Sequence, residues 1–377
     1  MKEGWTYKKL GEVCDIYGRI GFRGYTTKDL VDSPEKGAIS LSPSNILDGK
    51  MDYSKCTYIS WFKYEESPEI KIFNGDILLV KTGSSYGKSA LVENLPHEAT
   101  INPQSVVLKN FRINSKFFAY QLRTNTIRKE FDKFVSGTAI PTFSQAKLST
   151  VPIVFPPLDE QQRIVERLDS AFENIDKLKA NAEKQLAEAQ TLFKKSLAKA
   201  MEPKEGWEEF SFGELIKLQS GDYLPSKYMI NGKYPVYGGN GIAGYHNQYN
   251  RDGGKIVIGR VGALCGNVHY ITTPFWLTDN GFEVLLLKNI DIDFKYLSFY
   301  LNFLELGKYA RQTAQPVISN ASLKDVKLFI PSYTVQQRIV ERLDSLSENI
   351  RKYEEIQRQI ISECDALKQA LLRKVFE

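Results

Sequence analysis

The sequence predicts an α+β fold in which two mixed α/β globular domains are separated by two long antiparallel helices that form a coiled coil, with an internal pseudo-twofold repeat. Three observations predict it. The ten residues QQRIVERLDS occur twice without a mismatch, at 161–170 and at 336–345. Many short apolar runs punctuated by Gly and Asn precede each copy. A long stretch of helical, heptad-like periodicity follows each copy.

The repeat extends well beyond the decapeptide. SGTAIPTFSQAKLSTVPIVFPPLDE at 136–160 aligns with RQTAQPVISNASLKDVKLFIPSYTV at 311–335, at the same offset of 175. KEGWTYKKLGE at 2–12 returns as KEGWEEFSFGE at 204–214, at an offset of 202. The chain is therefore one unit written twice, with about 27 more residues in the middle of the first copy.

The middle of each copy predicts a strand, a glycine-rich turn and a second strand. GDILLVKTGSSYGKSALV at 75–92 resembles GKIVIGRVGALCGNVHYI at 254–271. Each segment has an apolar run, then a basic residue, then two glycines four residues apart, then another apolar run. The basic residues are Lys81 and Arg260. Helical stretches follow, at 115–134 and 293–310.

Each long helix has a seam of apolar or small side chains. The first seam is expected at Ile164, Leu168, Ala171, Ile175, Leu178 and Ala182, and then at Leu186, Ala189, Phe193 and Leu197. The second is expected at Ile339, Leu343, Leu346, Ile350, Tyr353, Ile360, Cys364, Leu367 and Leu371, broken at Gln357. Asp159 with Gln162, and Thr334 with Gln337, have the form of capping boxes at the helix starts.

Simple geometry predicts how the segments follow one another. A helix of about 42 residues is roughly 60 Å long, whereas the link from Met201 to Trp207 can stretch only about 20 Å. The second globular domain must therefore follow at the far end of the first helix, and the second helix must run back. The expected segments are globular domains at 1–157 and 202–332, and helices at 158–201 and 333–377.

Composition excludes several classes of protein. The chain has no run of about 18 uncharged apolar residues and no apolar segment at its N-terminus, so we expect a soluble cytoplasmic protein. The four cysteines form no CxxC pair and the three histidines lie far apart, so we expect no metal site. No Walker loop and no Asn/Asp-Pro-Pro-aromatic motif are present, which argues against ATP hydrolysis and amino-methyl transfer by this chain.

The excess of positive charge supports a nucleic-acid partner. Residues 1–157 carry the whole formal excess of +5, whereas residues 202–332 and both helical segments are neutral. A net charge of this size is ordinary for a soluble protein, and the neutral second domain argues against purely electrostatic binding. Helical segments with equal numbers of acidic and basic residues suit contact with protein better than contact with phosphate.

These features together resemble the specificity subunit of type I restriction-modification systems. The resemblance rests on TAxPxxSxAxLxxVxxxFP, which ends in IP in the second copy, followed by QQRIVERLDSxxENI and a long helix, all present twice. YPVYGGNGIAGYHNQYNRDGGKIVIGRVGALCGNV at 234–268 and FWLTDNGFEVLLL at 275–287 are similar to a target-recognition domain of that family. The resemblance covers essentially the full chain.

The resemblance implies a non-catalytic reader of double-stranded DNA. Each target-recognition domain would contact one half of an asymmetric bipartite site, and the two helices would set the gap between the halves. Two adenine-N6 methyltransferase subunits and ATP-dependent restriction subunits would be the partners. S-adenosylmethionine, ATP and magnesium would belong to those partners.

The expected DNA contacts are polar or basic residues on glycine-rich loops, where the backbone can approach a groove. Lys81 and Arg260 rank first because a basic residue recurs at the same place in both copies. Each of these residues could instead be a solvated loop residue or one that satisfies a turn. The candidates are Arg19, Arg23, Tyr25, Thr27, Lys28, Ser42, Ser44, Asn45, Lys81, Ser84, Ser85, Tyr86, Lys88, Asn102, Gln104, Asp222, Tyr223, Tyr237, Asn240, Tyr245, Arg260, Asn267, Thr278, Asp279 and Asn280.

The decapeptide supplies the expected partner surface. Its polar residues could merely cap and solvate the helices, but their identity in both copies favours a surface that the same kind of partner uses twice. The residues are Gln161, Gln162, Arg163, Glu166, Arg167, Gln336, Gln337, Arg338, Glu341 and Arg342. A two-headed coiled-coil scaffold that binds proteins without reading DNA is the alternative function.

Overall fold

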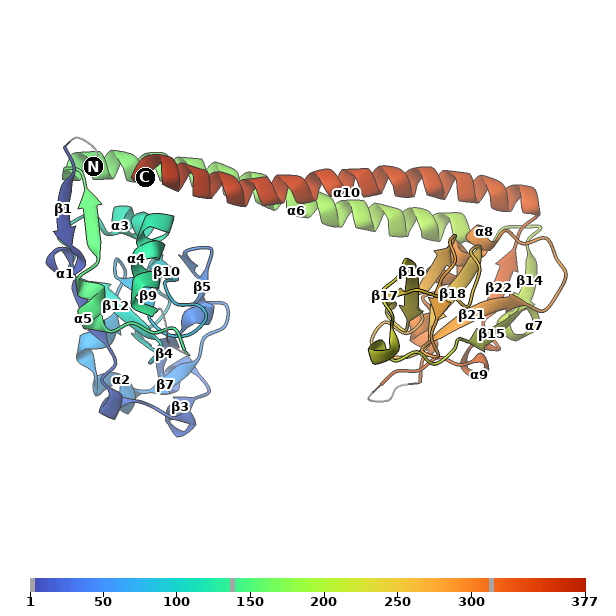
Figure 1. Ribbon diagram of the computed structural model, residues 1–377, viewed down its shortest axis with the longest axis horizontal. Helices are drawn as coiled ribbons and strands as arrows, with labels where there is room; N and C mark the ends of the chain where they lie inside the picture. The colour runs from blue at the N-terminus through green and yellow to red at the C-terminus, as the bar shows by residue number, and fades with distance from the viewer. Residues whose placement is uncertain (1–3, 136–139, 312–314) are drawn as a thin grey trace. The chain divides into compact units, whose positions relative to one another are not determined.

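The computed structural model describes residues 4–135, 140–311 and 315–377. The chain divides into two compact units, Met1–Asn181 with Ile360–Glu377, and Ala182–Gln359, which we call unit 1 and unit 2. Each unit contains one mixed α/β domain and part of each long helix (Figure 1). The expected α+β fold, with two mixed-sheet domains joined by two long helices, is confirmed.

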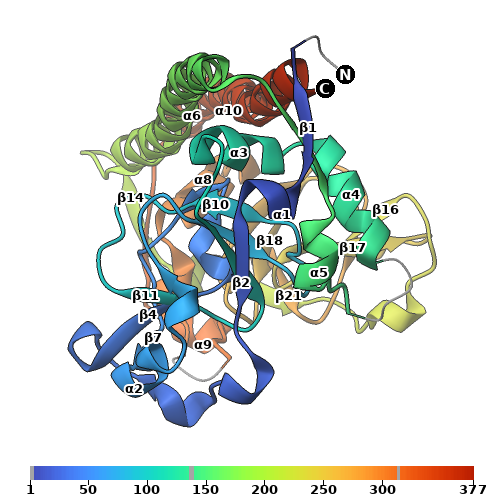
Figure 2. The same ribbon diagram turned by 90° about the vertical axis from the view of Figure 1, so that its left-hand side faces the viewer.

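Unit 1 is built on two mixed sheets (Figure 2). The six-stranded sheet has the order β2 (Asp15–Gly18), β12 (Ser105–Lys109), β9 (Ile77–Val80), β10 (Ser89–Leu91), β6 (Lys50–Met51) and β5 (Ile46–Leu47). The five-stranded sheet has the order β3 (Leu30–Val31), β7 (Tyr58–Ser60), β4 (Gly37–Leu41), β11 (Ala99–Ile101) and β8 (Lys71–Ile72). β1 (Thr6–Lys9) pairs with β13 (Pro152–Phe155).

Helices cover one side of the six-stranded sheet in unit 1. They are α1 (Leu10–Val13), α3 (Ser115–Leu122), α4 (Asn125–Val135) and α5 (Gln145–Ser149), while α2 (Trp61–Glu65) follows β7. Apolar side chains from these helices and from β9 and β12 form one core, and a second core lies between the two sheets. All four residues of β9 are buried, which is why this strand reads as an unbroken apolar run.

Unit 2 repeats the central part of unit 1. Its main sheet has the order β15 (Ile216–Ser220), β21 (Gly281–Leu286), β18 (Lys255–Gly259) and β19 (Val268–Ile271), which matches β2, β12, β9 and β10. β14 (Glu208–Ser211) pairs with β22 (Lys327–Ile330) as β1 pairs with β13. A three-stranded sheet of β17 (Gly241–His246), β16 (Tyr234–Gly238) and β20 (Trp276–Leu277) replaces the larger second sheet of unit 1. This replacement accounts for most of the difference in length between the first and the second copy of the repeat.

The helices of unit 2 also have counterparts in unit 1. They are α7 (Phe212–Leu215), α8 (Phe294–Phe303) and α9 (Asn320–Leu323). α8 begins at Asp293, whose carboxylate accepts from the N–H groups of Lys295 and Tyr296, as Asn114 caps α3. Short 3₁₀ helices lie at Gly21–Arg23, Thr27–Asp29, Pro34–Lys36, Pro43–Asn45, Pro68–Ile70, Ser226–Tyr228 and Leu306–Tyr309.

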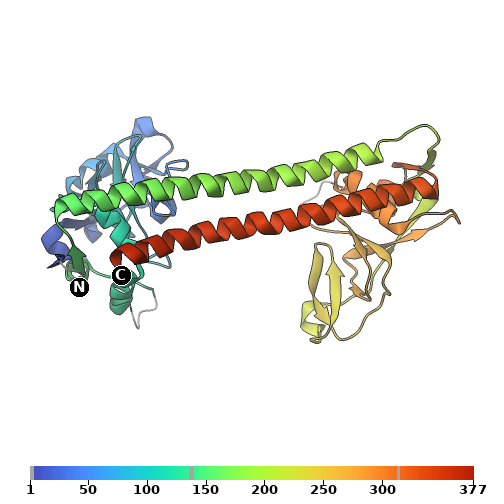
Figure 3. The ribbon, with the colours of Figure 1, turned by 90° about the horizontal axis from the view of Figure 1, so that it is seen from above.

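The two long helices are α6 (Leu158–Met201) and α10 (Tyr333–Phe376), each of 44 residues. Within each unit they lie side by side and run in opposite directions (Figure 3). In unit 1 the first half of α6 lies against the last part of α10, where Lys179 pairs with Asp365. In unit 2 the second half of α6 lies against the first part of α10, where the Tyr353 hydroxyl donates to Gln185. The expected antiparallel pairing is confirmed, and α6 ends at Met201.

The seam differs from the expected heptad frame. Leu178 and Leu367 are exposed, whereas Phe172, Gln357 and Lys368 are buried. Phe172 packs edge-on against Tyr120 of α3, with ring centroids 5.3 Å apart. The helix therefore buries a wider face than a two-helix seam, because it also covers the globular domain.

The predicted capping boxes at the starts of the two long helices are wrong. α6 and α10 begin at Leu158 and Tyr333, so Asp159 and Thr334 are already helical. The Asp159 carboxylate accepts from Arg163 one turn later, and this hydrogen bond is the main reason that the pKa of Asp159 is lowered. The carbonyls of Pro157 and Ser332 accept the first helical hydrogen bonds instead.

Candidate nucleic-acid interface and partner surface

Three loops meet at one end of each globular domain. In unit 1 we call the segments 81–88, 102–104 and 141–143 loop cluster 1. In unit 2 we call the segments 260–267, 278–280 and 315–317 loop cluster 2. The first segment of each cluster is the glycine-rich turn that joins two strands, β9 to β10 and β18 to β19. The expected strand-turn-strand units are confirmed.

The same backbone hydrogen bonds hold both clusters. The carbonyl of Gln104 accepts from the N–H of Lys81 at 2.8 Å, and that of Asn280 accepts from Arg260 at 2.9 Å. Gly83 donates to the carbonyl of Pro141 at 2.9 Å, and Gly262 donates to that of Pro316 at 3.1 Å. Pro141 and Pro316, the last residues of the two TAxP segments, therefore belong to the clusters. Thr138 and Thr313, the first residues of these segments, lie outside the described residues.

Side chains also stabilise the middle segment of each cluster in equivalent ways. The Asn102 carbonyl oxygen accepts from the N–H of Gln104, and the Thr278 hydroxyl accepts from the N–H of Asn280. Both Asn102 and Thr278 are buried, whereas Gln104 and Asn280 are exposed. The residue that holds the turn is thus hidden, and the residue two positions later faces solvent.

Glycine is required in the first segment of each cluster. Gly83, Gly87, Gly262 and Gly266 have φ values of 94°, 81°, 93° and 89°. Side chains rarely tolerate this left-handed region, which bends the strand connection tightly. A Cβ at Gly266 would also lie 2.3 Å from the backbone nitrogen of Gly307.

Lys81 and Arg260 occupy the same place but have different surroundings. Burial lowers the pKa of Lys81, and its ammonium has no ion pair among the residues that the structure describes. The Arg260 guanidinium donates to the carbonyl of Asp279 at 3.3 Å and lies 5.3 Å from the ring centroid of Phe282. A half-buried cation without a carboxylate suits an anionic ligand such as a phosphate.

The other candidate loops of unit 1 end at the same sheet edge. β4 and β11 run parallel, so Ser42–Asn45 and Asn102–Gln104 follow neighbouring strand ends. The N–H of Asn102 donates to the carbonyl of Leu41 at 2.8 Å. The structure therefore brings together the loops that contain Arg19, Ser44, Lys81 and Gln104.

Several candidate side chains are committed to the fold of unit 1. Arg19 is 7% exposed and donates to the Ile101 carbonyl and the Thr100 hydroxyl. The buried Asn45 amide donates to two loop carbonyls. The Tyr86 hydroxyl donates to Asp132, and the Arg128 guanidinium lies 3.9 Å from the Tyr86 ring centroid. With Asn102, these side chains support the loops.

The remaining candidates of unit 1 are partly or fully exposed. Arg23 forms an ion pair with Glu69 at 3.6 Å. The Tyr25 hydroxyl lies 2.8 Å from that of Ser40, and the Ser44 and Ser42 hydroxyls are 2.7 Å apart. The solvent-facing candidates are Thr27, Lys28, Ser44, Ser84, Lys88 and Gln104, while Ser85 and Lys81 are half-buried.

A groove of about 420 Å³ adjoins loop cluster 2. Glycines 238, 239, 241 and 262 line it, so backbone atoms form much of its wall. Its polar lining includes Asn240, Thr278, Asn280 and Gln315, of which Asn240 and Asn280 face solvent. A concave, glycine-rich wall with amide side chains can accept the edges of bases. Gln315 and Met229, also in the lining, were not among the candidates.

Apart from Asn240, Thr278 and Asn280, the candidates of unit 2 do not line this groove. The N–H of Asp222 donates to the Leu277 carbonyl, and the N–H of Thr278 donates to that of Tyr237. Tyr237 packs between His269 and Phe275, and burial raises the pKa of its hydroxyl. Tyr223, Tyr245 and Asn267 are exposed, and Asp279 is half-buried.

The decapeptide separates into a buried and an exposed set. Gln161 and Gln336 are 2% and 0% exposed. Each donates to the carbonyl of the proline five residues earlier, at 2.8 and 2.9 Å. These two glutamines therefore anchor the helix to the domain. Facing solvent are Gln162, Arg163, Glu166, Arg167, Gln337, Arg338, Glu341 and Arg342.

A second groove, of about 730 Å³, lies in unit 1 beside the start of α6. Glu166 and Arg167 line one side of it, and Leu371 and Val375 of α10 line the other. Ile164 and Trp5 add further apolar surface. Apolar walls with a charged rim are typical of surfaces that bind another protein.

The described part of the chain holds neither a candidate metal cluster nor a candidate membrane span. No group of three or more His, Cys, Asp or Glu side chains there could hold a metal ion. No helix among residues 4–135, 140–311 and 315–377 is long and apolar enough to cross a membrane.

Comparisons with known proteins agree with the repeat. The sequence matches the type I restriction modification DNA specificity domain twice, over residues 2–188 and 204–361. It is 26% identical over 306 residues to the type I restriction enzyme EcoprrI specificity subunit of Escherichia coli, with 74% of each chain covered.

Two solved structures share the fold. A chain from work on complex assembly and conformational transition of the type I R-M system gives a TM-score of 0.76 at 19% identity, covering 100% of this chain and 98% of that one. The HsdS subunit from Thermoanaerobacter tengcongensis gives a TM-score of 0.56 at 20% identity, covering 100% of this chain and 97% of that one. The chain belongs to the type I restriction-modification specificity family, and it is a specificity subunit, which recognises DNA targets and is itself non-catalytic.

Proposed function

We propose that this subunit reads an asymmetric, bipartite site on double-stranded DNA, with one half-site for each globular domain. Loop cluster 1 would contact one half and loop cluster 2 the other. The observation that carries this proposal is the equivalent backbone geometry of the two clusters, combined with different side chains at equivalent, exposed or half-buried positions. One scaffold thus presents Lys81 and Gln104 in the first domain, and Arg260 and Asn280 in the second.

These side chains suit two kinds of contact. Arginine can bond guanine through two hydrogen bonds, and Asn or Gln can bond adenine in the same way, each pair contributing about 1–3 kcal/mol of discrimination. Lys81 suits a phosphate, because its half-buried ammonium forms no ion pair with a carboxylate among the described residues. We leave Arg19, Asn45 and Asn102 out of the proposed contact surface, because the fold already uses their side chains.

We also propose that two adenine-N6 methyltransferase subunits dock on the exposed decapeptide residues, one at each helix start. The groove between Arg167 and Leu371 supports a protein partner at the first of these places. ATP-dependent restriction subunits would join the methyltransferases. S-adenosylmethionine, ATP and magnesium would then belong to the partners, and the complex would act in the cytoplasm.

The proposed division of labour follows the four sequence segments. Residues 1–157 and 202–332 would be the target-recognition domains, and residues 158–201 and 333–377 would be spacer helices. The helices would set the unread gap between the half-sites, because readers on one face of a duplex must lie about one helical turn, roughly 34 Å, or a multiple apart.

Genome-wide mapping of methyladenine tests the reading function. A host expressing the methyltransferase with this chain should gain methylation at a split motif with two defined halves. Gln104→Ala should relax only one half, and Asn280→Ala only the other, whereas the exposed controls Lys8→Ala and Lys217→Ala should leave the motif intact. Relaxation of both halves by either variant would contradict the assignment of one half-site to each cluster.

The same experiment separates the reader from a scaffold. A scaffold protein would copurify with the methyltransferase, yet methylation would show no motif that depends on this chain. Methyl transfer by the purified chain alone would contradict the non-catalytic role.

A further inference from the structure

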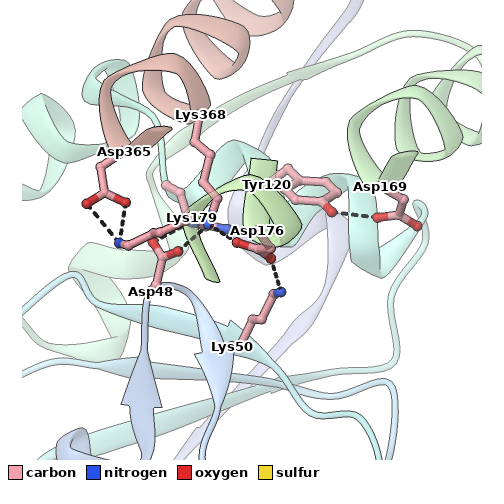
Figure 4. A network of polar contacts seen from close by, with 9 residues as sticks. Asp48, Lys50, Tyr120, Asp169, Asp176, Lys179, Asp365 and Lys368 are labelled. Carbon is pink, nitrogen blue, oxygen red and sulfur yellow. Dashed lines mark hydrogen bonds and ion pairs between the residues drawn. The ribbon is translucent and has the colours of Figure 1, made fainter. Parts of the chain in front are cut away.

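A network of charged side chains joins both long helices to the globular domain of unit 1 (Figure 4). We call Asp48, Lys50, Asp176, Lys179, Asp365 and Lys368 the charge network. Lys368 lies at its centre, with its ammonium 2.5 Å from Asp48 and 2.6 Å from Asp176. Lys179 of α6 contacts both carboxylate oxygens of Asp365 on α10, at 2.7 and 2.9 Å.

The position of Lys368 makes this network selective. Its side chain is only 4% exposed, so the ammonium needs carboxylates to replace water. Burial alone would lower the pKa of Lys368, but hydrogen bonds to Asp176 and Asp48 outweigh burial and raise it. The lysine therefore stays charged because of two carboxylates, that of Asp176 on α6 and that of Asp48 in the turn between β5 and β6. Any other helix in the place of α6 must supply an acid opposite this lysine.

The internal repeat creates a competing arrangement. Because α6 and α10 share the decapeptide, α10 of a second copy could take the place of α6 against α10 of the first copy. The offset of 175 between the repeats identifies the residues that would then meet. Arg351 would stand where Asp176 stands, and Glu354 would stand where Lys179 stands.

Both replacements produce like-charge contacts. Arg351 would face the buried Lys368, and Glu354 would face Asp365. A pair of identical antiparallel helices is symmetric, so each unfavourable contact would occur twice. Lys368 would also lose Asp48, which belongs to the globular domain.

The opposite replacement, in which α6 of a second copy takes the place of α10, is also unfavourable. In a pair of α6 helices from two copies, Phe193 would stand in the place of Lys368, and Gln190 in the place of Asp365. Asp176 would then lose one of its two lysines, and Lys179 would lose its carboxylate. The apolar seam does not discriminate among these pairings as sharply, because apolar and small residues recur in both helices.

We propose that the charge network selects the pairing of α6 with α10 of the same chain and rejects the pairing of α10 with α10 of a second copy. The seam supplies the area that is buried, and the network supplies the choice of partner. This inference concerns association between copies of the chain and does not depend on DNA recognition.

Asp365→Lys in the full chain reverses the selection. The new lysine would face Lys179 within the chain, but it would face Glu354 of a second copy in the α10 pair. Two tagged forms of the chain, coexpressed and captured in sequence, measure the association between copies. We expect Asp365→Lys to raise the captured fraction about tenfold above wild type, which corresponds to about 1.4 kcal/mol.

Carbodiimide cross-linking of mixed light and heavy isotope-labelled copies identifies the contact. This reagent joins an amine directly to a carboxylate. In wild type it should join Lys179 to Asp365 of the same copy. In Asp365→Lys it should join position 365 to Glu354 of the other copy. Within one helix these positions are about 16 Å apart, too far for a direct link.

Two matched variants complete the test. Lys179→Asp combined with Asp365→Lys restores an attractive pair within the chain, so association between copies should return to the wild-type level. Glu183→Lys changes an exposed helical residue by the same charge and should leave association unchanged. An Asp365→Lys protein that associates no more than wild type overturns the proposal. So does increased capture without the link to Glu354, or without reversal in the double variant.

Discussion

Gln336 accepts a hydrogen bond from the backbone N–H of Asp293, with 2.8 Å between Oε1 and N. Gln161 accepts from the N–H of Asn114 at the same distance. Asp293 and Asn114 are the N-cap residues of α8 and α3. The first glutamine of each decapeptide therefore joins the start of a long helix to the start of a domain helix. The fold alone explains why glutamine recurs at this position.

Removing either glutamine should loosen only its own unit. Gln336→Ala leaves the Asp293 N–H and the Pro331 carbonyl without their partner, which costs about 1–3 kcal/mol. Hydrogen exchange should become faster at the starts of α8 and α10 and stay unchanged in α3. Gln161→Ala should show the opposite pattern, and the exposed Gln337→Ala should change neither. Equal loosening of both units by either variant would contradict this account.

The exposed decapeptide residues should control methyltransferase binding. Arg163→Glu should remove one of two bound methyltransferases, and Arg163→Glu combined with Arg338→Glu should remove both, because each reversal places repulsion at one docking surface. Native mass spectrometry counts the subunits, and circular dichroism checks that helicity is retained. Lys184→Glu, in the middle of α6, is the control. An unchanged stoichiometry in the double variant would refute the docking surface.

Lys81 should make DNA binding sensitive to pH. Because burial lowers its pKa, Lys81 loses its charge at a lower pH than an exposed lysine, whose pKa is about 10.4. Affinity should therefore fall as pH rises toward that value. Lys81→Arg should remain charged and keep its affinity, whereas the exposed Lys8→Arg should follow wild type.

Salt dependence checks the same contact independently. Lys81→Ala should reduce the slope of log affinity against log salt concentration by about 1, because one phosphate contact is lost. Binding titrations at several salt concentrations measure this slope. An unchanged slope together with an unchanged pH profile would assign Lys81 to the fold.

The glycines of loop cluster 2 should differ in their tolerance of alanine. Gly262→Ala meets no atom within 4 Å but has φ 93°, so the backbone strain costs roughly 1–2 kcal/mol. Gly266→Ala adds a clash with Gly307 and should cost more. Urea unfolding of the two variants measures the difference. Equal midpoints would show that Gly307 can move away without cost.

Sequence periodicity and repetition were enough to predict the elements. An exact repeat, apolar runs and glycine spacing all act locally, through backbone conformation and helical periodicity. The turns at Gly83 and Gly262 and the antiparallel helices could therefore be predicted. The same local rules selected loops that do converge at one end of each domain.

Exposure and hydrogen-bond partners of single residues could not be predicted in this way. Arg19 and Lys81 both follow strands and both carry a positive charge, yet the Arg19 guanidinium donates to the carbonyl of Ile101, some eighty positions later in the chain. Lys368 lies beside the expected seam residue Leu367 and takes its buried place, because Asp48 and Asp176 approach it.

The sequence by itself determined that the chain is a duplicated unit, where its long helices run and which loops carry polar groups. Only the tertiary structure decided which of those polar groups remain available. The reason is physical: folding brings distant segments together, and these neighbours decide whether a polar side chain is hydrogen-bonded within the protein or stays exposed to solvent. The Gln161 side chain accepts from the N–H of Asn114, while Gln162, one residue later on the helix, faces solvent.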